Sequence, residues 1–457
     1  MKYTTKFVDI LQCPVCQASQ WNQESKSLQC QSCQQVFPDY GDITWFFKDP
    51  DESVRDWQNR FNYFSQATDI EVLQLKTELK QDRLLATTQN RLQKLIQAKI
   101  EHNREVLKIM EPIRVTGHGQ AEHSIALKVK LPETQALMSY YSNVLRDWSY
   151  GDEENQICLD LILKTIGPEK NLGSFGVFGA GACRLPYDVH RSTECERTIA
   201  VDINPYLFYV AKRALSGKNL TLYEFPMAPV NLDAHGVKLK CKAPTSLKDG
   251  FHFLLADAMN PSFVDHAFDT IMTPWIIDIV HQDIRDLFRR FNRILKVGGR
   301  WINFGSLAFF HRQFHLCYSL EETLEIVKES GFEVERHFQE DIPYLHSPYS
   351  SQKRTEKVVS FCAKKIADID QPEEFHYLPK WLLNLDEPIP LLTDLQQQVL
   401  VNQTLADVFR LIDGKRSLTE LARDAAPQLQ LPIENVQTML RGLLTKFFED
   451  RLRGRQF

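Results

Sequence analysis

The chain of 457 residues lacks any apolar run near the ~20 residues that a transmembrane helix needs, so no membrane span is expected. Ten cysteines are too few for a disulfide-stapled scaffold, which favours a reducing compartment. Lys and Arg number 54 against 59 Asp and Glu, so no basic excess predicts nucleic-acid binding by bulk charge, although a local basic patch remains open. The opening MKYTTKFVDILQC has no sustained apolar core, and we expect no secretory signal and a cytoplasmic protein.

What the chain does have is enough apolar sequence for a substantial core. Hydrophobic residues make up 43% and charged residues 25%, which excludes wholesale disorder, and the length suits more than one domain. Changes in pattern along the chain predict a zinc ribbon, a helical linker or cap, an α/β domain, a proline-bearing acidic linker and a small helical domain. These segments span residues 1–48, 49–150, 151–366, 367–390 and 391–457, respectively.

Four cysteines near the N-terminus have the spacing of metal ligands. Cys13 and Cys16 form one C-x2-C pair, and Cys30 and Cys33 form a second pair after thirteen residues. Two such knuckles can place four thiolates tetrahedrally around one ion, and soft thiolates favour zinc. Because four cysteines leave no open coordination position, we expect a structural or partner-docking zinc site. The flanking Val36-Phe37-Pro38 and Gly41-Asp42-Ile43 make this segment resemble the zinc ribbon of Trm112-like proteins.

The middle of the chain alternates between short β-rich runs and amphipathic helices. This alternation predicts a doubly wound, Rossmann-like α/β domain with a parallel sheet. The clearest helix places Ile284, Leu287, Phe288 and Phe291 on one face. Residues 216–250 fit no regular element, and we interpret them as a long insertion. The predicted strands are Ser174–Phe178, Thr198–Val201, His252–Leu255, Asp269–Met272, Arg300–Phe304, Glu333–His337 and Val358–Ala363.

A glycine-rich loop between the first predicted strand and a helix indicates a nucleoside cofactor. Gly176, Gly179 and Gly181 allow a sharp turn and a close approach to a ligand. Asp202 follows the next hydrophobic strand, where a carboxylate accepts hydrogen bonds from both ribose hydroxyls of an adenosine. Cys183 stands where dinucleotide-binding loops carry their third glycine, which disfavours a pyrophosphate and favours S-adenosylmethionine.

Two further acidic residues follow the next two strands. Asp257 is placed to reach an adenine amino group, with a helix N-cap as the alternative. Asp278 follows the fourth strand, at the edge of the sheet where ligands bind, and capping of the next helix is again the alternative. Together with the loop and Asp202, these positions predict an S-adenosylmethionine-dependent methyltransferase.

Several of these motifs resemble one family closely. Arg146-Asp-Trp-Ser, Gly179-Ala-Gly181, Asp278 with His281, and Trp301-Ile-Asn-Phe-Gly305 resemble the carnosine N-methyltransferase family over about residues 140–365. The resemblance implies that Arg146 binds the carboxylate of S-adenosylmethionine and that Asp278 binds the imidazole of the substrate. It assigns the methionine end and ribose to Gly179, Gly181 and Asp202, and the adenine to Asp257 and Ala258.

The acceptor side departs from the family pattern. Phe309 stands where the family has a substrate-binding histidine, and His311 takes that role only if the loop shifts. We therefore expect a carnosine-like acceptor, and another histidine-containing small molecule or peptide fits as well as carnosine itself. The residues around Ile412-Asp-Gly-Lys415 resemble the winged-helix-like PqqD fold, which binds peptides, so a protein partner could dock there or on the ribbon. Alternatives are a methyltransferase for RNA or a translation protein, an inactive methyltransferase-like scaffold, and a nicotinamide oxidoreductase.

Overall fold

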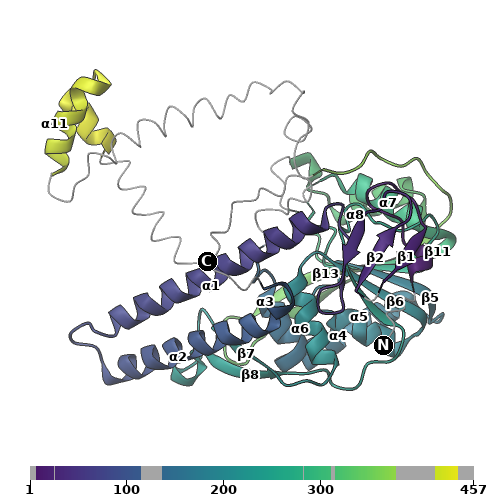
Figure 1. Ribbon diagram of the computed structural model, residues 1–457, viewed down its shortest axis with the longest axis horizontal. Helices are drawn as coiled ribbons and strands as arrows, with labels where there is room; N and C mark the ends of the chain where they lie inside the picture. The colour runs from purple at the N-terminus through teal and green to yellow at the C-terminus, as the bar shows by residue number, and fades with distance from the viewer. Residues whose placement is uncertain are drawn as a thin grey trace. The chain divides into compact units, whose positions relative to one another are not determined.

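The computed structural model describes residues 7–24, 26–114, 136–280, 282–309, 314–376 and 417–440. The chain forms two compact units, residues 1–379 and 380–457. Within the described ranges, every helix is too short or too polar to serve as a membrane span. Figure 1 shows the larger unit as a twisted sheet with helices on both faces, a small N-terminal sheet and a long helical hairpin.

The N-terminal segment, predicted to be a zinc ribbon, folds as a small antiparallel sheet. After the short helix η1 (Val8–Ile10), strands β1 (Trp21–Gln23), β2 (Ser27–Cys30) and β3 (Val36–Pro38) form an antiparallel sheet. The rings of Trp21, Phe37 and Phe46 pack together beneath this sheet. So small a sheet buries little apolar surface, and the four cysteines lie where a cross-link would add most to its stability.

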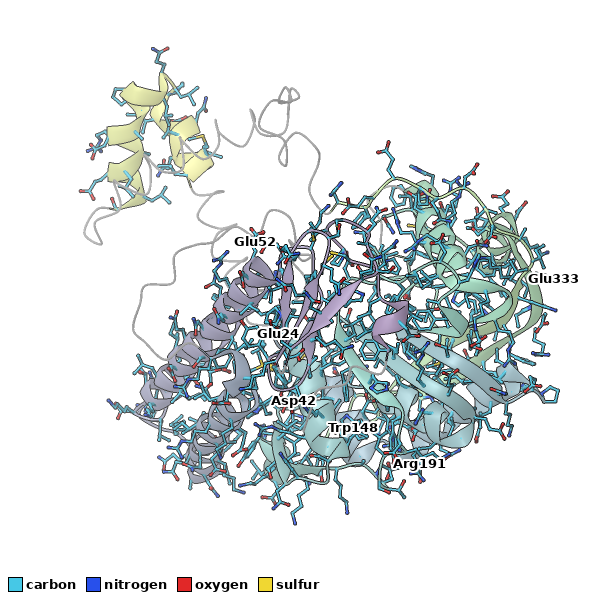
Figure 2. The ribbon with its side chains drawn as sticks, turned by 45° about the vertical axis from the view of Figure 1, so that its right-hand side comes forward. Glu24, Asp42, Glu52, Trp148, Arg191 and Glu333 are labelled. Atoms are coloured by element: carbon cyan, nitrogen blue, oxygen red, sulfur yellow. The ribbon has the colours of Figure 1, made fainter. Side chains whose placement is uncertain are left out.

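The ribbon is continuous with the α/β domain, a contact that the sequence analysis did not predict. Strand β4 (Thr44–Trp45) pairs in parallel with β9 (Phe251–Leu255) and becomes an edge strand of the central sheet. Asp42, labelled in Figure 2, accepts a hydrogen bond from Lys212 of the helix α6 (Pro205–Leu215) at 2.8 Å. The ribbon is therefore docked on the chain's own sheet.

The described part of 49–150 is helical, as predicted. Helices α1 (Pro50–Glu78) and α2 (Ala86–Ile109) form an antiparallel hairpin that extends away from the sheet in Figure 1. Asp49 caps α1 by accepting a hydrogen bond from the backbone of Glu52, and Pro50 occupies the first turn, where its missing N–H costs nothing. The short elements η2 (Glu111–Ile113), α3 (Tyr141–Leu145) and the π-helical turn η3 (Arg146–Tyr150) lead into α4 (Asp152–Ile166).

The central sheet has the order β12-β13-β11-β10-β5-β6-β9-β4. Five of its pairings are parallel, and β13 runs antiparallel to both of its neighbours. From β5, the chain first adds β6 and β9 on one side of the sheet and then adds β10 and β11 on the other side. The sheet therefore has a topological switch point between β5 and β10. The doubly wound fold is thus confirmed. The strands not yet bounded are β5 (Asn171–Phe178), β6 (Glu194–Asp202), β10 (Phe268–Pro274), β11 (Leu295–Gly305), β12 (Phe332–Tyr344) and β13 (Arg354–Lys365).

Helices cover the sheet because their apolar faces match it. Helix α7 (Ile284–Ile294) begins at an Asp283 cap and buries Leu287, and its Phe288 and Phe291 rings pack against Trp301 of β11. The remaining helices are α5 (Arg184–Ser192) and α8 (Leu320–Glu329), with the short turns η4 (Leu232–Ala234) and η5 (Phe314–Leu316). The ring of Trp301 also contacts Phe332 and Phe361, so it ties three strands and α7 into one core.

The interpretation of residues 216–250 as irregular is wrong. The segment holds a hairpin, β7 (Leu220–Glu224) and β8 (Val237–Cys241), which is separate from the main sheet and packs against α2. Leu220 and Leu222 alternate toward the core, as do Leu239 and Cys241. Alternation at a period of two is the pattern of a half-buried strand, and here it extends over only five residues in each strand.

The C-terminal unit is described over 417–440. Helix α11 (Leu418–Leu429) begins with a capping box between Ser417 and Glu420, and a small cluster that includes Leu421, Ala425 and Val436 is buried. Most of the PqqD-like segment 391–457, including Ile412–Lys415, lies outside the described residues, so that resemblance stays a prediction. Of the predicted linker, residues 367–376 are described.

Candidate active site

A cavity opens at the carboxyl ends of β5, β6, β9 and β10, at the switch point of the sheet. This is where ligands bind in doubly wound folds. All six residues that were predicted to hold the cofactor line it: Arg146, Gly179, Gly181, Asp202, Asp257 and Ala258. They come from four different segments of the chain, which the fold brings together.

The glycine loop forms one wall of the cavity. Gly179 has φ of +73°, and a Cβ there would lie 3.1 Å from Cβ of Ile276, so only glycine fits without strain. The backbone N–H groups of Gly179 and Ala180 both donate to the carbonyl of Val201 at 3.0 Å, which joins the loop to β6. Cys183 adopts a left-handed φ of +63° and precedes the first turn of α5. The glycines therefore let the backbone of this loop come close to a ligand.

Asp202 is placed at the tip of β6, where the ribose of an adenosine is expected. Its Oδ2 accepts a hydrogen bond from the backbone of Gly181 at 2.8 Å, and its Oδ1 accepts one from Asn204 at 2.9 Å. Burial raises the pKa of Asp202 to about 6, and the backbone donors oppose that shift only in part. Each carboxylate oxygen can accept a further bond, so both can still receive a ribose hydroxyl.

Arg146 is buried beneath the cavity between two carboxylates. Its Nε donates to Asp147 at 2.8 Å, Nη2 lies 2.7 Å from the same carboxylate, and Nη1 donates to Glu154 at 3.1 Å. Burial opposes the charge of the guanidinium, but Asp147 and Glu154 outweigh it and raise the pKa of Arg146. Arg146 is therefore cationic at any physiological pH.

The same geometry leaves Arg146 able to bind an outside carboxylate. With these partners Nη1 and Nη2 each retain a second N–H, and two parallel N–H groups match a carboxylate. Trp148, labelled in Figure 2, donates from Nε1 to the carbonyl of Ala182 at 2.9 Å and so ties this π-helical turn to the glycine loop. A further donor in the cavity wall, Asn143, bonds to the hydroxyl of Tyr344 at 3.0 Å.

Asp257 and Ala258 lie on the loop after β9. Asp257 accepts hydrogen bonds from the backbone of Met259 at 2.8 Å and from the side-chain amide of Asn260 at 3.2 Å. The carboxylate thus shapes its own loop, and no α-helix begins within that loop. The helix-cap alternative for Asp257 is therefore wrong.

Asp278 lies apart from the cofactor-binding residues. It is only 5% exposed, and it is not among the described residues that line the cavity, although Ile276 and Ile279 are. Its Oδ2 accepts hydrogen bonds from Oγ of Ser306 at 2.6 Å and from the backbone of Ala308 at 3.1 Å. Burial raises the pKa of Asp278, and these two donors oppose the shift. The cap of α7 is Asp283, so the capping alternative for Asp278 is wrong.

The other predicted acceptor residue, His311, lies outside the described residues, as does His281. Phe309, at the position of the family histidine, is buried, and its ring meets the ring of Tyr318 edge-on. The loop after β11 therefore approaches Asp278 through Ser306 and Ala308, and the part that holds His311 follows directly after Phe309.

The sequence analysis missed an aromatic wall of the cavity. Trp275 has φ of +53°, its ring lies 4.9 Å from that of Tyr344, and its buried Nε1 has no hydrogen-bond partner among the described residues. A bulky residue in this backbone region is strained and is frequently found at functional sites. Its only sequence signal was its position directly after the fourth strand. Tyr140, Tyr344 and Phe375 complete the wall.

The four cysteines of the ribbon lie together. Sγ of Cys13 is 3.7 Å from that of Cys33, Sγ of Cys16 is 3.5 Å from that of Cys30, and all four sulfurs lie within 4.8 Å of one another. The pairing across the two knuckles is the arrangement that one tetrahedral ion requires.

Comparison with known proteins agrees with this site. The sequence model of the carnosine N-methyltransferase family matches residues 124–367, more than half of the chain. The chain belongs to the carnosine N-methyltransferase family. It is therefore an S-adenosylmethionine-dependent methyltransferase, and the cavity fits that cofactor: a guanidinium for its carboxylate, a glycine loop for close approach and a carboxylate for its ribose.

A search of solved structures returns methyltransferases at low identity and low TM-score. A Bacillus halodurans protein described as a methyltransferase has a TM-score of 0.32 at 11% identity, over 46% of this chain and 99% of that one. A Methanosarcina mazei S-adenosylmethionine-dependent methyltransferase scores 0.30 at 13% identity, over 43% and 93%. An N-methyltransferase of Haemonchus contortus, solved with S-adenosylhomocysteine, scores 0.33 at 16%, over 51% and 59%. A search of curated proteins finds no match.

Proposed function

We propose that this family member N-methylates the imidazole ring of a histidine-containing small molecule or peptide. The observation that carries the proposal is the buried carboxylate of Asp278, after β10, in a chain of the carnosine N-methyltransferase family. When bound, S-adenosylmethionine supplies a methyl group on a sulfonium, and its in-line transfer depends mainly on the position of the attacking atom.

A carboxylate suits an imidazole acceptor for a simple reason. A neutral imidazole attacks through its unprotonated nitrogen, so its other nitrogen carries the N–H. A carboxylate that accepts from this N–H fixes the tautomer and makes the attacking nitrogen more electron-rich. Both loop donors use Oδ2 of Asp278, so Oδ1 is not occupied by Ser306 or Ala308. Burial raises the pKa of Asp278, and an N–H donor at Oδ1 would oppose that shift and favour the ionised carboxylate.

The test is incubation with labelled S-adenosylmethionine and a pool of histidine-containing metabolites and peptides, followed by mass spectrometry of the methylated product. We expect methylation of a ring nitrogen, loss of at least roughly 100-fold in kcat/KM for Asp278→Asn, and unchanged cofactor affinity. Asp341→Asn, at an exposed carboxylate on β12, is the matched control. Methyl transfer to RNA or to a translation protein alone, or no turnover by a protein that binds the cofactor, would contradict the proposal.

We also propose that Cys13, Cys16, Cys30 and Cys33 hold one structural zinc ion. The support is the close set of four sulfurs in a segment with little core of its own. Metal analysis should give one zinc per chain, and Cys30→Ser should lose it. Because β4 of this segment pairs with β9, metal removal should also lower the thermal midpoint of the α/β domain. A metal-free protein with an unchanged midpoint would refute the structural role.

A further inference from the structure

A short segment beyond the family-matched region contributes one residue to the wall of the cavity. The match ends at residue 367, and the chain then continues through Gln371–His376. The half-buried ring of Phe375 lines the cavity together with Asp257, Ala258 and Met259. An aromatic side chain from outside the Rossmann-like core is therefore part of the cofactor pocket wall.

The backbone of Phe375 is held by a reciprocal pair of hydrogen bonds. Its N–H donates to Oδ1 of Asn260 at 3.0 Å, and its carbonyl accepts from Nδ2 of the same amide at 3.0 Å. The amide of Asn260 also donates to Asp257 at 3.2 Å. One side chain thus fixes Phe375 relative to the loop that was predicted to flank the adenine.

Two cations from other elements hold the residues just before Phe375. Arg290 of α7, only 6% exposed, donates to the carbonyl of Glu373 at 2.6 Å. Lys48, just after β4, pairs with the carboxylate of Glu374 at 2.8 Å. The salt bridge is exposed and contributes little, whereas the buried Arg290 contact and the Asn260 pair fix the backbone.

We propose that Phe375 is a cofactor-binding residue whose ring stacks on the purine of S-adenosylmethionine. Asn260 bonds to both the Phe375 backbone and Asp257, so Phe375 joins the cavity lining beside the loop that holds Asp257 and Ala258. A purine offers a flat π-face that stacks on aromatic rings. The inference concerns the cofactor alone, so it stands or fails independently of the imidazole acceptor.

The test is calorimetric titration of the full chain with S-adenosylmethionine and with 5′-methylthioadenosine, which keeps the purine but lacks the amino-acid end. For Phe375→Ala we expect Kd to rise by about tenfold for both ligands, in line with loss of one stacked base. Phe375→Trp should restore most of the affinity. Tyr63→Ala, at an aromatic residue that is 76% exposed on α1, should change neither Kd.

Asn260→Ala gives a second approach, because it releases the backbone of Phe375 without removing the ring. It should weaken the binding of both ligands less than Phe375→Ala does. Lys48→Ala should leave both Kd values almost unchanged. Unchanged Kd in the folded Phe375→Ala protein would overturn the proposal. Tighter binding by that variant would overturn it too, because the ring would then occupy the purine site in the free protein.

Discussion

The two ends of this active site are built in different ways. The cofactor end is made largely from backbone and from residues at strand tips: the Gly179 loop, Asp202 after β6 and Asp257 after β9 all face one cavity. The proposed acceptor end rests on one side chain, Asp278, on the loop after β10. Asp278 is buried against Ser306 and Ala308, and it lies outside the set of described residues that line the same cavity.

The difference indicates which part of the enzyme is fixed by the fold. A turn at Gly179 and a carboxylate after a parallel strand follow from topology, so any acceptor must adapt to them. The position of Asp278 depends instead on two contacts with the loop after β11. We therefore expect that changes at the cofactor end abolish binding, whereas changes at the acceptor end alter turnover and specificity.

Loss of the Asp202 carboxylate should have the largest effect. Asp202→Ala removes the expected acceptor of two ribose hydroxyls and leaves the backbone N–H groups of Gly181 and Asn204 without their partner. Two lost charge-assisted bonds at about 1.5–3 kcal/mol each predict a rise of at least roughly 100-fold in Kd for S-adenosylmethionine. Calorimetric titration measures this Kd, and Asp341→Ala, which removes an exposed carboxylate, is the control. If the folded variant bound S-adenosylmethionine normally, Asp202 would not be a cofactor-binding residue.

Replacement of Arg146 should have a smaller effect, on the methionine end only. Arg146→Lys keeps the charge between Asp147 and Glu154 but loses the paired N–H groups. We expect Kd for S-adenosylmethionine to rise by about tenfold to thirtyfold. Binding of 5′-methylthioadenosine, which has no carboxylate, should stay the same, and an equal loss for both ligands would indicate a general disturbance instead.

The fold and the cofactor end could be predicted because their signals are local. Strands β5, β6, β9 and β10 contain hydrophobic runs, and the residues predicted to bind the cofactor lie close after such a run, in the glycine loop or in the Arg146 motif. The structure keeps the order of the predicted strands and extends them, most of all β11 and β12, which are more than twice as long as predicted. The hairpin β7–β8 escaped prediction because its alternation covers only five residues per strand, and β4 because two residues carry no periodicity.

The rest of the pocket could not be predicted because tertiary contacts create it. Nothing near Phe375 in the sequence indicates that Asn260, 115 residues away, holds its backbone. The strain at Trp275 arises where its backbone N–H donates to the carbonyl of Phe304 on the neighbouring strand. The contact of Ser306 with Asp278 likewise depends on how two adjacent strands end.

Cofactor affinity should depend on pH through Asp202. Because burial raises the pKa of Asp202 to about 6, the carboxylate is ionised at pH 7 and mostly protonated at pH 5. Hydrogen bonds from ribose hydroxyls favour the ionised form, so affinity is present above this pKa and is lost as the pH falls through it. We expect Kd to rise about tenfold between pH 7 and pH 5. Asp202→Asn should bind the cofactor weakly at both pH values. If Kd of that variant still changed with pH as it does in the wild type, a group other than Asp202 would be responsible.

Replacement of Ser306 should have the smallest effect, and it should change the kinetics of the acceptor without changing cofactor affinity. Ser306→Ala removes the 2.6 Å hydrogen bond to Asp278, which lets the carboxylate turn and raises its pKa further, since that bond opposes the effect of burial. We expect kcat/KM for the acceptor to fall several-fold, and to fall more at lower pH where more of Asp278 is protonated. Kd for S-adenosylmethionine should not change.

Ser306→Thr retains the hydroxyl and should restore most of this activity, while Ser216→Ala, which removes an exposed hydroxyl at the end of α6, should have no effect. A loss of cofactor affinity equal to the loss of turnover would mean that the two ends of the site are not separable. If instead only the acceptor parameters move, the loop after β11 sets the substrate while the glycine loop and Asp202 set the cofactor.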